Sequence, residues 1–305
     1  MSSLARRAGR LLGAGGRIRA QLPPLRRGRD HRHDRLAQRA RRSSLRAASA
    51  RARSRLGWLD SLAGTCPDRY FDWMAQAGWS RGNLRFYLEY LFDGVDFRGR
   101  RVLDVGAGDG KFSFYAACMG ATEVVGLEPE AQGSSAGASS AFEETASLLG
   151  LENIELVPTR LEDYDPKANA FDVLLLHASI NHLDEDACIR LREDARAHAV
   201  YREMFDRLAA LARPGADLIA QDCSPHNLFA ALRVRNPFEP TIEWHKHQRP
   251  ELWAELLGEV GFENPRIRWN SFNSLRSFGR QVIGNRVASF LLTSAFVLTM
   301  QRIRS

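Results

Sequence analysis

After residue 98, short apolar runs alternate with segments of helical spacing. The runs that suit strands are Arg101 to Val105, Val124 to Leu127, Ile154 to Val157, Phe171 to Leu176, Leu218 to Ala220 and Val287 to Met300. The segments that suit helices are Lys111 to Met119, Ala141 to Leu149, Glu185 to Ala212 and Leu252 to Val260. Strands that alternate with helices form a mainly parallel sheet covered on both faces, so the pattern predicts a doubly wound α/β fold.

Residues 57–98 are rich in aromatic side chains. Phe86 and Tyr90 are four residues apart and would share one helical face. We expect one or two amphipathic helices that cap the main domain and bury most of these rings. A lid over a small-molecule pocket is the alternative use of the rings.

Residues 1–56 hold 17 Arg, no Lys and only two acids, Asp30 and Asp34, which gives this segment a charge of +15. The remaining 249 residues carry −8, although the whole chain has a formal charge of +7. The segment has no Phe, Tyr or Trp, so we expect a disordered tail. The tail could bind nucleic acid or an anionic membrane, act as a transit peptide, or be a dispensable extension.

The four cysteines, Cys66, Cys118, Cys188 and Cys223, form no CxxC pair. Their spacing argues against a zinc site and favours reduced thiols, and hence a cytoplasmic location. The most apolar late stretch, Val287 to Met300, is too short to span a membrane and suits a buried strand. We therefore expect no transmembrane segment and no metal.

The strongest chemical signal is the segment from Val102 to Gly110, with glycines at positions 106, 108 and 110, between a predicted strand and a predicted helix. Glycines let the backbone turn sharply and approach a ligand. Glu128 ends the next strand, where an acid can bind the hydroxyls of a ribose. A dinucleotide-binding loop would place its third glycine where Lys111 stands, which favours S-adenosylmethionine (SAM) over NAD.

These motifs resemble those of the class I SAM-dependent methyltransferases. The matching segments are Asp104-x-Gly106-x-Gly108-x-Gly110, Leu127-Glu128-Pro129, Phe171 to Leu176, Asn181-His182-Leu183, Leu211 to Gly215 and Val260-Gly261-Phe262. The likeness spans residues 99–301 and assigns the domain to 99–305. It implies a Rossmann-like seven-stranded sheet whose last strand, Ser294 to Gln301, is antiparallel to its neighbours.

The resemblance also implies which residues hold the cofactor. They are Asp104, Gly106, Ala107, Gly108, Gly110, Glu128, Pro129, Leu161, Glu162 and His177. The sequence departs from the family at Arg160-Leu161, where relatives often have Asp-Ala beside the adenine. Glu162 or Asp163 would then make the contact to the adenine amino group. His177 is either a wall of the SAM pocket or a packing residue.

Three histidines are candidates for the base that takes a proton from an acceptor hydroxyl. His182 follows the fourth predicted strand, and its alternative role is a structural hydrogen bond in the turn. His245 and His247 lie in residues 222–250, a predicted acceptor-binding insertion. With Asp222 they could bind a metal, but two histidines and one carboxylate make a weak case for it.

We expect methyl transfer from SAM to an oxygen of a small-molecule or glycan acceptor. The insertion resembles that of methyltransferases from bacterial polysaccharide or secondary-metabolite pathways, and Arg233 and Arg235 would suit a phosphate-bearing acceptor. No Asn-Pro-Pro-Tyr type tetrapeptide follows Leu176, as it does in many amino-group methylases. The alternatives are an N- or C-methyltransferase, a protein or RNA methyltransferase, and a non-catalytic SAM-binding regulatory domain.

Overall fold

The computed structural model describes residues 64–129, 138–166 and 170–303. Contacts within the chain separate Met1–Arg55 from Leu56–Ser305. The disordered tail predicted for residues 1–56 lies outside the described residues. The description that follows therefore concerns the second unit alone.

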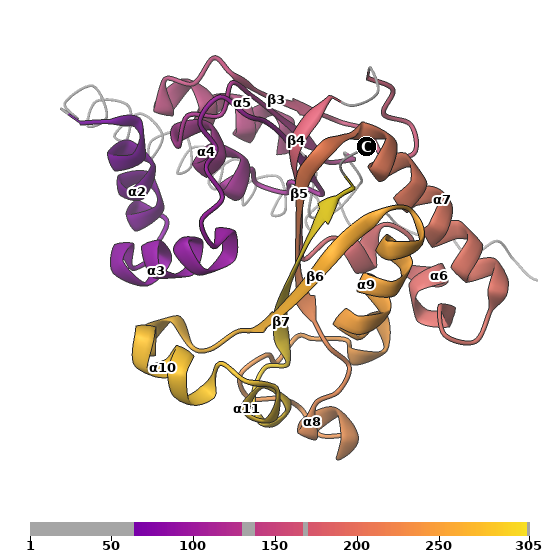
Figure 1. Cartoon of the computed structure of the whole chain (residues 1–305). Coiled ribbons are helices and arrows are strands. Elements are labelled where there is room, and N and C mark those ends of the chain that lie inside the picture. The colour runs from indigo at the N-terminus through magenta and orange to yellow at the C-terminus, as the bar shows by residue number, and fades with distance from the viewer. Residues whose placement is uncertain (1–63, 130–137, 167–169, 304–305) are drawn as a thin grey trace, which may run out of the picture. The chain divides into compact units, whose positions relative to one another are not determined.

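One seven-stranded sheet forms the centre of this unit, in the order β3-β2-β1-β4-β5-β7-β6 (Figure 1). The strands are β1 (Arg101–Val105), β2 (Glu123–Leu127), β3 (Ile154–Val157), β4 (Phe171–His177), β5 (Ala212–Cys223), β6 (Phe262–Trp269) and β7 (Ala295–Arg302). Strands β1 to β5 pair in parallel, whereas β7 is antiparallel to both β5 and β6. The predicted Rossmann-like sheet with an antiparallel last strand is confirmed.

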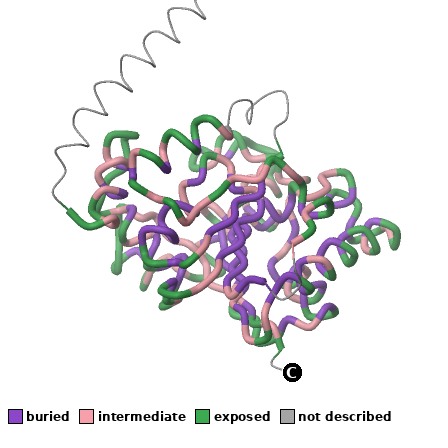
Figure 2. Tube along the Cα trace, turned by 90° about the horizontal axis from the view of Figure 1, so that it is seen from above, coloured by how far each residue is buried: buried purple, intermediate pink, exposed green. Residues whose placement is uncertain are grey.

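Helices cover the two faces of the sheet. On one face lie α2 (Cys66–Gln76), α3 (Arg81–Phe92), α4 (Lys111–Cys118) and α5 (Ala138–Leu149), and on the other α6 (Glu185–Arg190), α7 (Ala195–Leu211) and α9 (Pro250–Glu259). Successive strand residues point to opposite faces. In β4, Val173 and Leu175 therefore join the first core, while Leu174 and Leu176 join the second. Figure 2 shows the buried strands between the two helical layers.

The aromatic lead-in, for which one or two helices were predicted, forms two, α2 and α3. Helix α2 begins with a capping box, in which the Thr65 side chain accepts from the Asp68 N–H and the Asp68 side chain accepts from the Thr65 N–H. Ser80 caps α3 in a similar way through the Asn83 N–H. Tyr70, Phe71 and other lead-in rings are buried against α4, as expected for core aromatic residues.

The prediction of one continuous helix from Glu185 to Ala212 is wrong. The segment is broken into α6 and α7, because Asp194 leaves the helical conformation and accepts a hydrogen bond from the Arg196 N–H at 2.8 Å. Its end at Leu211 lies within one residue of the prediction, and Ala212 pairs with Phe171 of β4. Strand β5 contains Pro214 and Gly215 and begins earlier than the predicted strand Leu218 to Ala220.

The prediction of one strand over Val287 to Met300 is also wrong in its first half. The Asn285 side chain accepts from the Ala288 N–H at 3.0 Å and starts helix α11 (Arg286–Leu291). The strand begins only at Ala295. Between β5 and β7 the chain also forms the short elements α8 (Leu228–Ala231), η2 (Trp244–Lys246), η3 (Asn273–Leu275) and α10 (Arg276–Ile283). No helix in the described ranges has the length and apolar character needed to span a bilayer.

A disulfide joins Cys66 at the start of α2 to Cys118 at the end of α4, with 5.0 Å between the Cα atoms. The expectation that all thiols are reduced is therefore wrong for this pair. Sequence spacing could not reveal it, because 52 residues separate the two cysteines and only the packing of α2 on α4 brings them together. The cytoplasmic location that was inferred from reduced thiols stays a prediction.

Candidate functional site

A large cleft of about 1300 Å³ opens at the carboxyl ends of β1, β2, β4 and β5. The chain fills the sheet in one direction from β1 to β3 and then returns to place β4 on the other side of β1. Ligands of open α/β sheets bind at such a reversal, outside the carboxyl ends of the strands. The glycine loop, Glu128 and His177 all line this cleft.

The glycine loop follows β1. At two of its positions, 106 and 110, only glycine fits, because any side chain would collide with a neighbour. Gly106 has φ +75°, and a Cβ there would lie 2.5 Å from the Cβ of Ser179. Gly110 also has φ +75°, and a Cβ there would collide with the Phe142 ring. The loop therefore keeps its backbone open to the cleft while it packs against η1 (Ile180–His182) and α5.

Asp104 lies beneath this loop and is almost fully buried. Its Oδ2 accepts a hydrogen bond from the Ser113 hydroxyl at 2.6 Å, which ties β1 to α4. Burial raises the pKa of Asp104 to about 7, and the Ser113 bond opposes that rise. The carboxyl group thus holds a proton far more readily than an exposed aspartate.

Glu128 stands at the end of β2, opposite the glycine loop. Its Oε2 accepts a hydrogen bond from the Gly108 N–H at 2.9 Å. The carboxylate and the open glycine backbone face the same part of the cleft, which suits a ligand with hydroxyl groups close to the chain. This arrangement fits the ribose of a nucleoside cofactor.

Nine of the ten residues predicted to hold the cofactor line the cleft: Asp104, Gly106, Ala107, Gly108, Glu128, Pro129, Leu161, Glu162 and His177. Gly110 is not among the lining residues, because it lies behind the loop against Phe142 and Phe114. At the position where the family often has Asp-Ala, Leu161 is buried and Glu162 is exposed. Both still border the cleft.

His177 is held as a neutral wall of the cleft. Its Nε2 lies 2.6 Å from the Tyr87 hydroxyl, and the Phe112 ring lies over it with a centroid distance of 4.0 Å. Burial and the nearby Lys111 charge lower the pKa of His177 to about 3, whereas burial raises the pKa of Tyr87. Tyr87 therefore keeps its proton and donates a hydrogen bond to His177 Nε2.

The three histidines predicted as bases lie in different surroundings. His182 lines the cleft, and its Nδ1 is 2.6 Å from Glu185 Oε1. His245 and His247 are not among the lining residues. His247 instead approaches the buried Asp222, with 2.9 Å between Nδ1 and Oδ1.

The His247–Asp222 contact fastens the insertion to the sheet. The next residue, Gln248, is buried and donates from Nε2 to the Cys188 carbonyl at 2.6 Å. Within the residues that the structure describes, no three His, Cys, Asp or Glu side chains gather as metal ligands would. The contacts of His247 and Gln248 thus anchor the insertion to the rest of the domain. His245 lies beside them in η2.

Sequence reasoning missed several residues of the cleft. Tyr87 and Trp79 reach it from the lead-in, and Cys223 and Glu239 reach it from β5 and the insertion. Burial raises the pKa of Glu239, and the Cys223 thiol, whose pKa is also raised by burial, lies near it. No local motif marks these residues, because tertiary packing alone brings them to the cleft.

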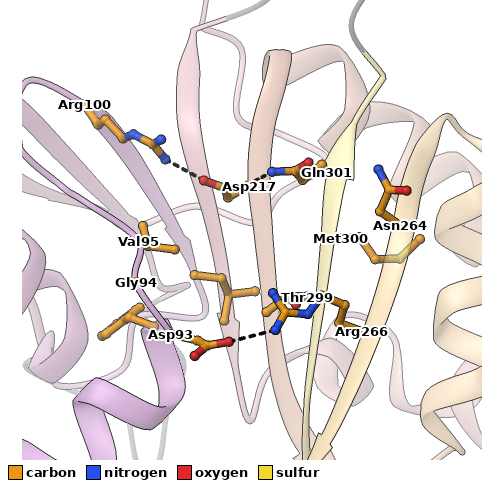
Figure 3. Close-up of a pocket in the computed structure, with 12 residues that line it drawn as sticks. Asp93, Gly94, Val95, Arg100, Asp217, Asn264, Arg266, Thr299, Met300 and Gln301 are labelled. Carbon is orange, nitrogen blue, oxygen red and sulfur yellow. Dashed lines mark hydrogen bonds and ion pairs between the residues drawn. The ribbon is translucent and has the colours of Figure 1, made fainter.

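A smaller pocket of about 330 Å³ lies near the amino end of β5 (Figure 3). Arg100 approaches Asp217 at 2.6 Å, and the Gln301 amide donates to the same carboxylate at 3.0 Å. Arg266 pairs with Asp93 at 3.2 Å across the same pocket. These charges are paired with one another and join the lead-in to β5, β6 and β7.

Comparisons with known proteins agree with the site. Residues 102–200 match the model of a family described as a methyltransferase domain. A curated relative, the ribosomal protein L11 methyltransferase of Marinobacter nauticus, is 30% identical over 172 residues. The match covers 56% of this chain and 48% of the relative, so the chain spans about half of that protein's length.

Solved structures of similar fold include SAM-dependent methyltransferases from Aquifex aeolicus and Archaeoglobus fulgidus. The first is 15% identical, with a TM-score of 0.49 over 71% of this chain and 89% of its own. The second is 15% identical, with a TM-score of 0.48 over 76% of this chain and 99% of its own. Residues 102–200 thus match a methyltransferase domain, and the glycine loop and the strand order are those expected for S-adenosylmethionine as its cofactor.

Proposed function

We propose that the chain transfers a methyl group from SAM to an oxygen atom of a small-molecule or glycan acceptor. The observation that carries the proposal is the single cleft that holds both the glycine loop with Glu128 and an acceptor end lined by Tyr87, His182 and Glu239. SAM supplies a methyl group on a positively charged sulfur, which is already reactive toward a nucleophile. The protein then has to align the acceptor and remove its proton.

The cofactor would be held by the loop from Gly106 to Gly108 and by Glu128, with Leu161 and Glu162 beside its adenine. Asp104 would fix the loop from beneath through its bond to Ser113. These roles follow from the positions of the residues around the cleft.

We assign the proton-accepting role to His182. If Nδ1 donates to the Glu185 carboxylate, Nε2 carries no proton. An acceptor hydroxyl that replaces the Asn181 amide, which lies 3.4 Å from Nε2, could then give its proton to this nitrogen. Lys246 also pairs with Glu185 at 3.0 Å and lowers the pKa of that carboxyl together with His182. Glu185 therefore stays charged and favours the protonated imidazole that proton transfer would create.

Glu239 is proposed to bind the acceptor. Its half-buried carboxyl lines the cleft, and no ion pair or side-chain hydrogen bond is described for it. A hydroxyl of the acceptor would satisfy this group at the acceptor end of the cleft. The small polar side chains of Asn270 and Asn273 line the same cleft and suit a polyhydroxylated molecule.

A protein acceptor is the second candidate. It is favoured by the 30% identity to a ribosomal protein L11 methyltransferase. The match covers 48% of that relative, so about half of its length lies outside the match. We therefore rank a protein acceptor below a small molecule or glycan.

The test uses purified full-length protein, methyl-labelled SAM and a cell extract separated into small molecules, lipids, glycans, protein and RNA. We expect label in the small-molecule or glycan fraction, and its loss in Glu128→Ala. The matched control is Glu152→Ala, which changes an exposed acid that does not line the cleft. Label in the protein fraction would favour the second candidate, and no label in any fraction would contradict both.

A further inference from the structure

Helices α10 and α11 carry an unusual set of exposed apolar side chains, which we call the α10–α11 patch. It consists of Leu275, Phe278, Val282, Val287 and Leu291. The exposed fraction reaches 67% for Phe278 and 72% for Val287. Single exposed apolar residues are ordinary, but a group of them on neighbouring helices marks an interaction surface. The two helices contact each other and lie side by side in Figure 1.

The orientation of α10 is opposite to that of an ordinary surface helix. Leu275, Phe278 and Val282 are spaced so that they form one stripe, and all three are exposed. Arg280 instead points inward, with its guanidinium 4.2 Å from the Phe86 ring centroid and 4.5 Å from that of Tyr90. The cation thus anchors α10 to α3, while the apolar stripe faces outward.

The charge around the patch is mainly positive, with Glu251 as an acidic neighbour of Arg286. From residue 264 to residue 305 the chain has seven Arg and neither Asp nor Glu. Arg276 at the start of α10 is exposed, and Arg286 at the start of α11 is also exposed, with Glu251 3.2 Å away. Arg233 and Arg235 follow α8, which contacts α11. Exposed apolar side chains among arginines match a bilayer surface with anionic headgroups.

We propose that the α10–α11 patch docks on an anionic lipid bilayer, with its apolar side chains inserted at the level of the headgroups. The patch is continuous with the cleft, because Asn273 lines the cleft and belongs to η3 (Asn273–Leu275), which leads directly into α10. Docking would bring the acceptor end of the cleft to the membrane surface.

The test is flotation of the full-length protein with vesicles of phosphatidylcholine and phosphatidylglycerol, without SAM. The variant Phe278→Ser/Val282→Ser/Val287→Ser removes the most exposed apolar side chains of the patch. The matched control, Ile189→Ser/Val200→Ser, removes exposed apolar side chains from α6 and α7. An unchanged affinity for SAM, measured by calorimetry, shows that both variants are folded.

High salt distinguishes vesicle binding through the patch from binding through the arginines of residues 1–56. At about 0.5 M NaCl the screening length falls to about 4 Å, so purely electrostatic attachment is released whereas apolar insertion persists. We expect the wild type and the control to stay bound in this salt, and the triple variant to bind at least about tenfold more weakly.

Three results would overturn the proposal: no binding by the wild type, its complete release by salt, or equal binding by the triple variant. Sedimentation without vesicles tests whether a second copy of the chain binds the patch instead. Self-association that the triple variant abolishes, with no vesicle binding, would assign the patch to a second copy of the chain. None of these outcomes depends on methyl transfer, so they leave the proposed function to its own test.

Discussion

Reduction of the Cys66–Cys118 disulfide should strongly destabilise the domain. The bond closes a loop that spans 52 residues, from the first turn of α2 to the last residue of α4. A cross-link over a loop of this length restricts the unfolded chain by an amount worth about 4 kcal/mol. For a domain of this size, that free energy corresponds to a fall in Tm of roughly 8 to 16 °C.

The assay is urea unfolding of the oxidised protein, the protein with a thiol-free reductant, and the variant Cys66→Ser/Cys118→Ser. We expect the variant to resemble the reduced protein and to be insensitive to reductant. Thiol titration in denaturant should find only Cys188 and Cys223 before reduction. Four titratable thiols in the untreated protein, or an unchanged free energy of unfolding on reduction, would refute the reasoning.

Three further predictions concern the cleft. Burial raises the folded-state pKa of Asp104 to about 7 from 3.8, so the stability that its proton provides is complete below about pH 4 and is lost as the pH rises through 7. The gain in stability of Asp104→Asn over the wild type, measured by SAM-free unfolding, should therefore grow across this window; a pH-independent difference would contradict it. Gly106→Ala should cost more than about 1 kcal/mol in unfolding free energy, because its φ is left-handed and the new Cβ meets Ser179; a neutral effect would show that the loop can relax. His182→Gln should lower kcat by about a hundredfold or more and leave SAM affinity unchanged, whereas His198→Gln, a surface control paired with Glu259, should do neither; equal activity of the two variants would remove His182 as the base.

The parallel half of the fold was predictable because its strands are short apolar runs that end at residues, such as glycine, which interrupt regular secondary structure. Strand β1 is followed at once by three glycines, and the run over β4 is buried on both faces. The antiparallel edge was harder to place. Its seventh strand came from the family resemblance, since the apolar character of Val287 to Met300 extended over a helix that only the Asn285 cap reveals.

The positions of the glycine loop and Glu128 at the cleft were predictable for a related reason. The glycine loop and Glu128 each sit beside the strand that positions them, so spacing along the sequence reflects spacing in the fold. The acceptor end was not predictable in this way. Tyr87 and Glu239 are about 150 residues apart in the sequence, and both reach the cleft from segments outside the recurring strand–helix pattern.

The histidines illustrate the same limit. His182 and His247 are equally plausible bases in the sequence, but the first faces the cleft and the second pairs with the buried Asp222. The pattern could place both near the carboxyl ends of strands. It could not tell which side of β5 the insertion packs on.

The central claim is that this cleft binds SAM through the glycine loop and Glu128. The most direct test is calorimetric titration of the full-length protein with SAM, beside the variants Glu128→Ala and Glu152→Ala. Loss of the hydrogen bonds that a charged carboxylate accepts from the ribose hydroxyls should weaken binding by about tenfold to a hundredfold in Glu128→Ala, and Glu152→Ala should bind as the wild type does. Failure of the wild type to bind SAM, or an unchanged affinity in Glu128→Ala, would contradict the account.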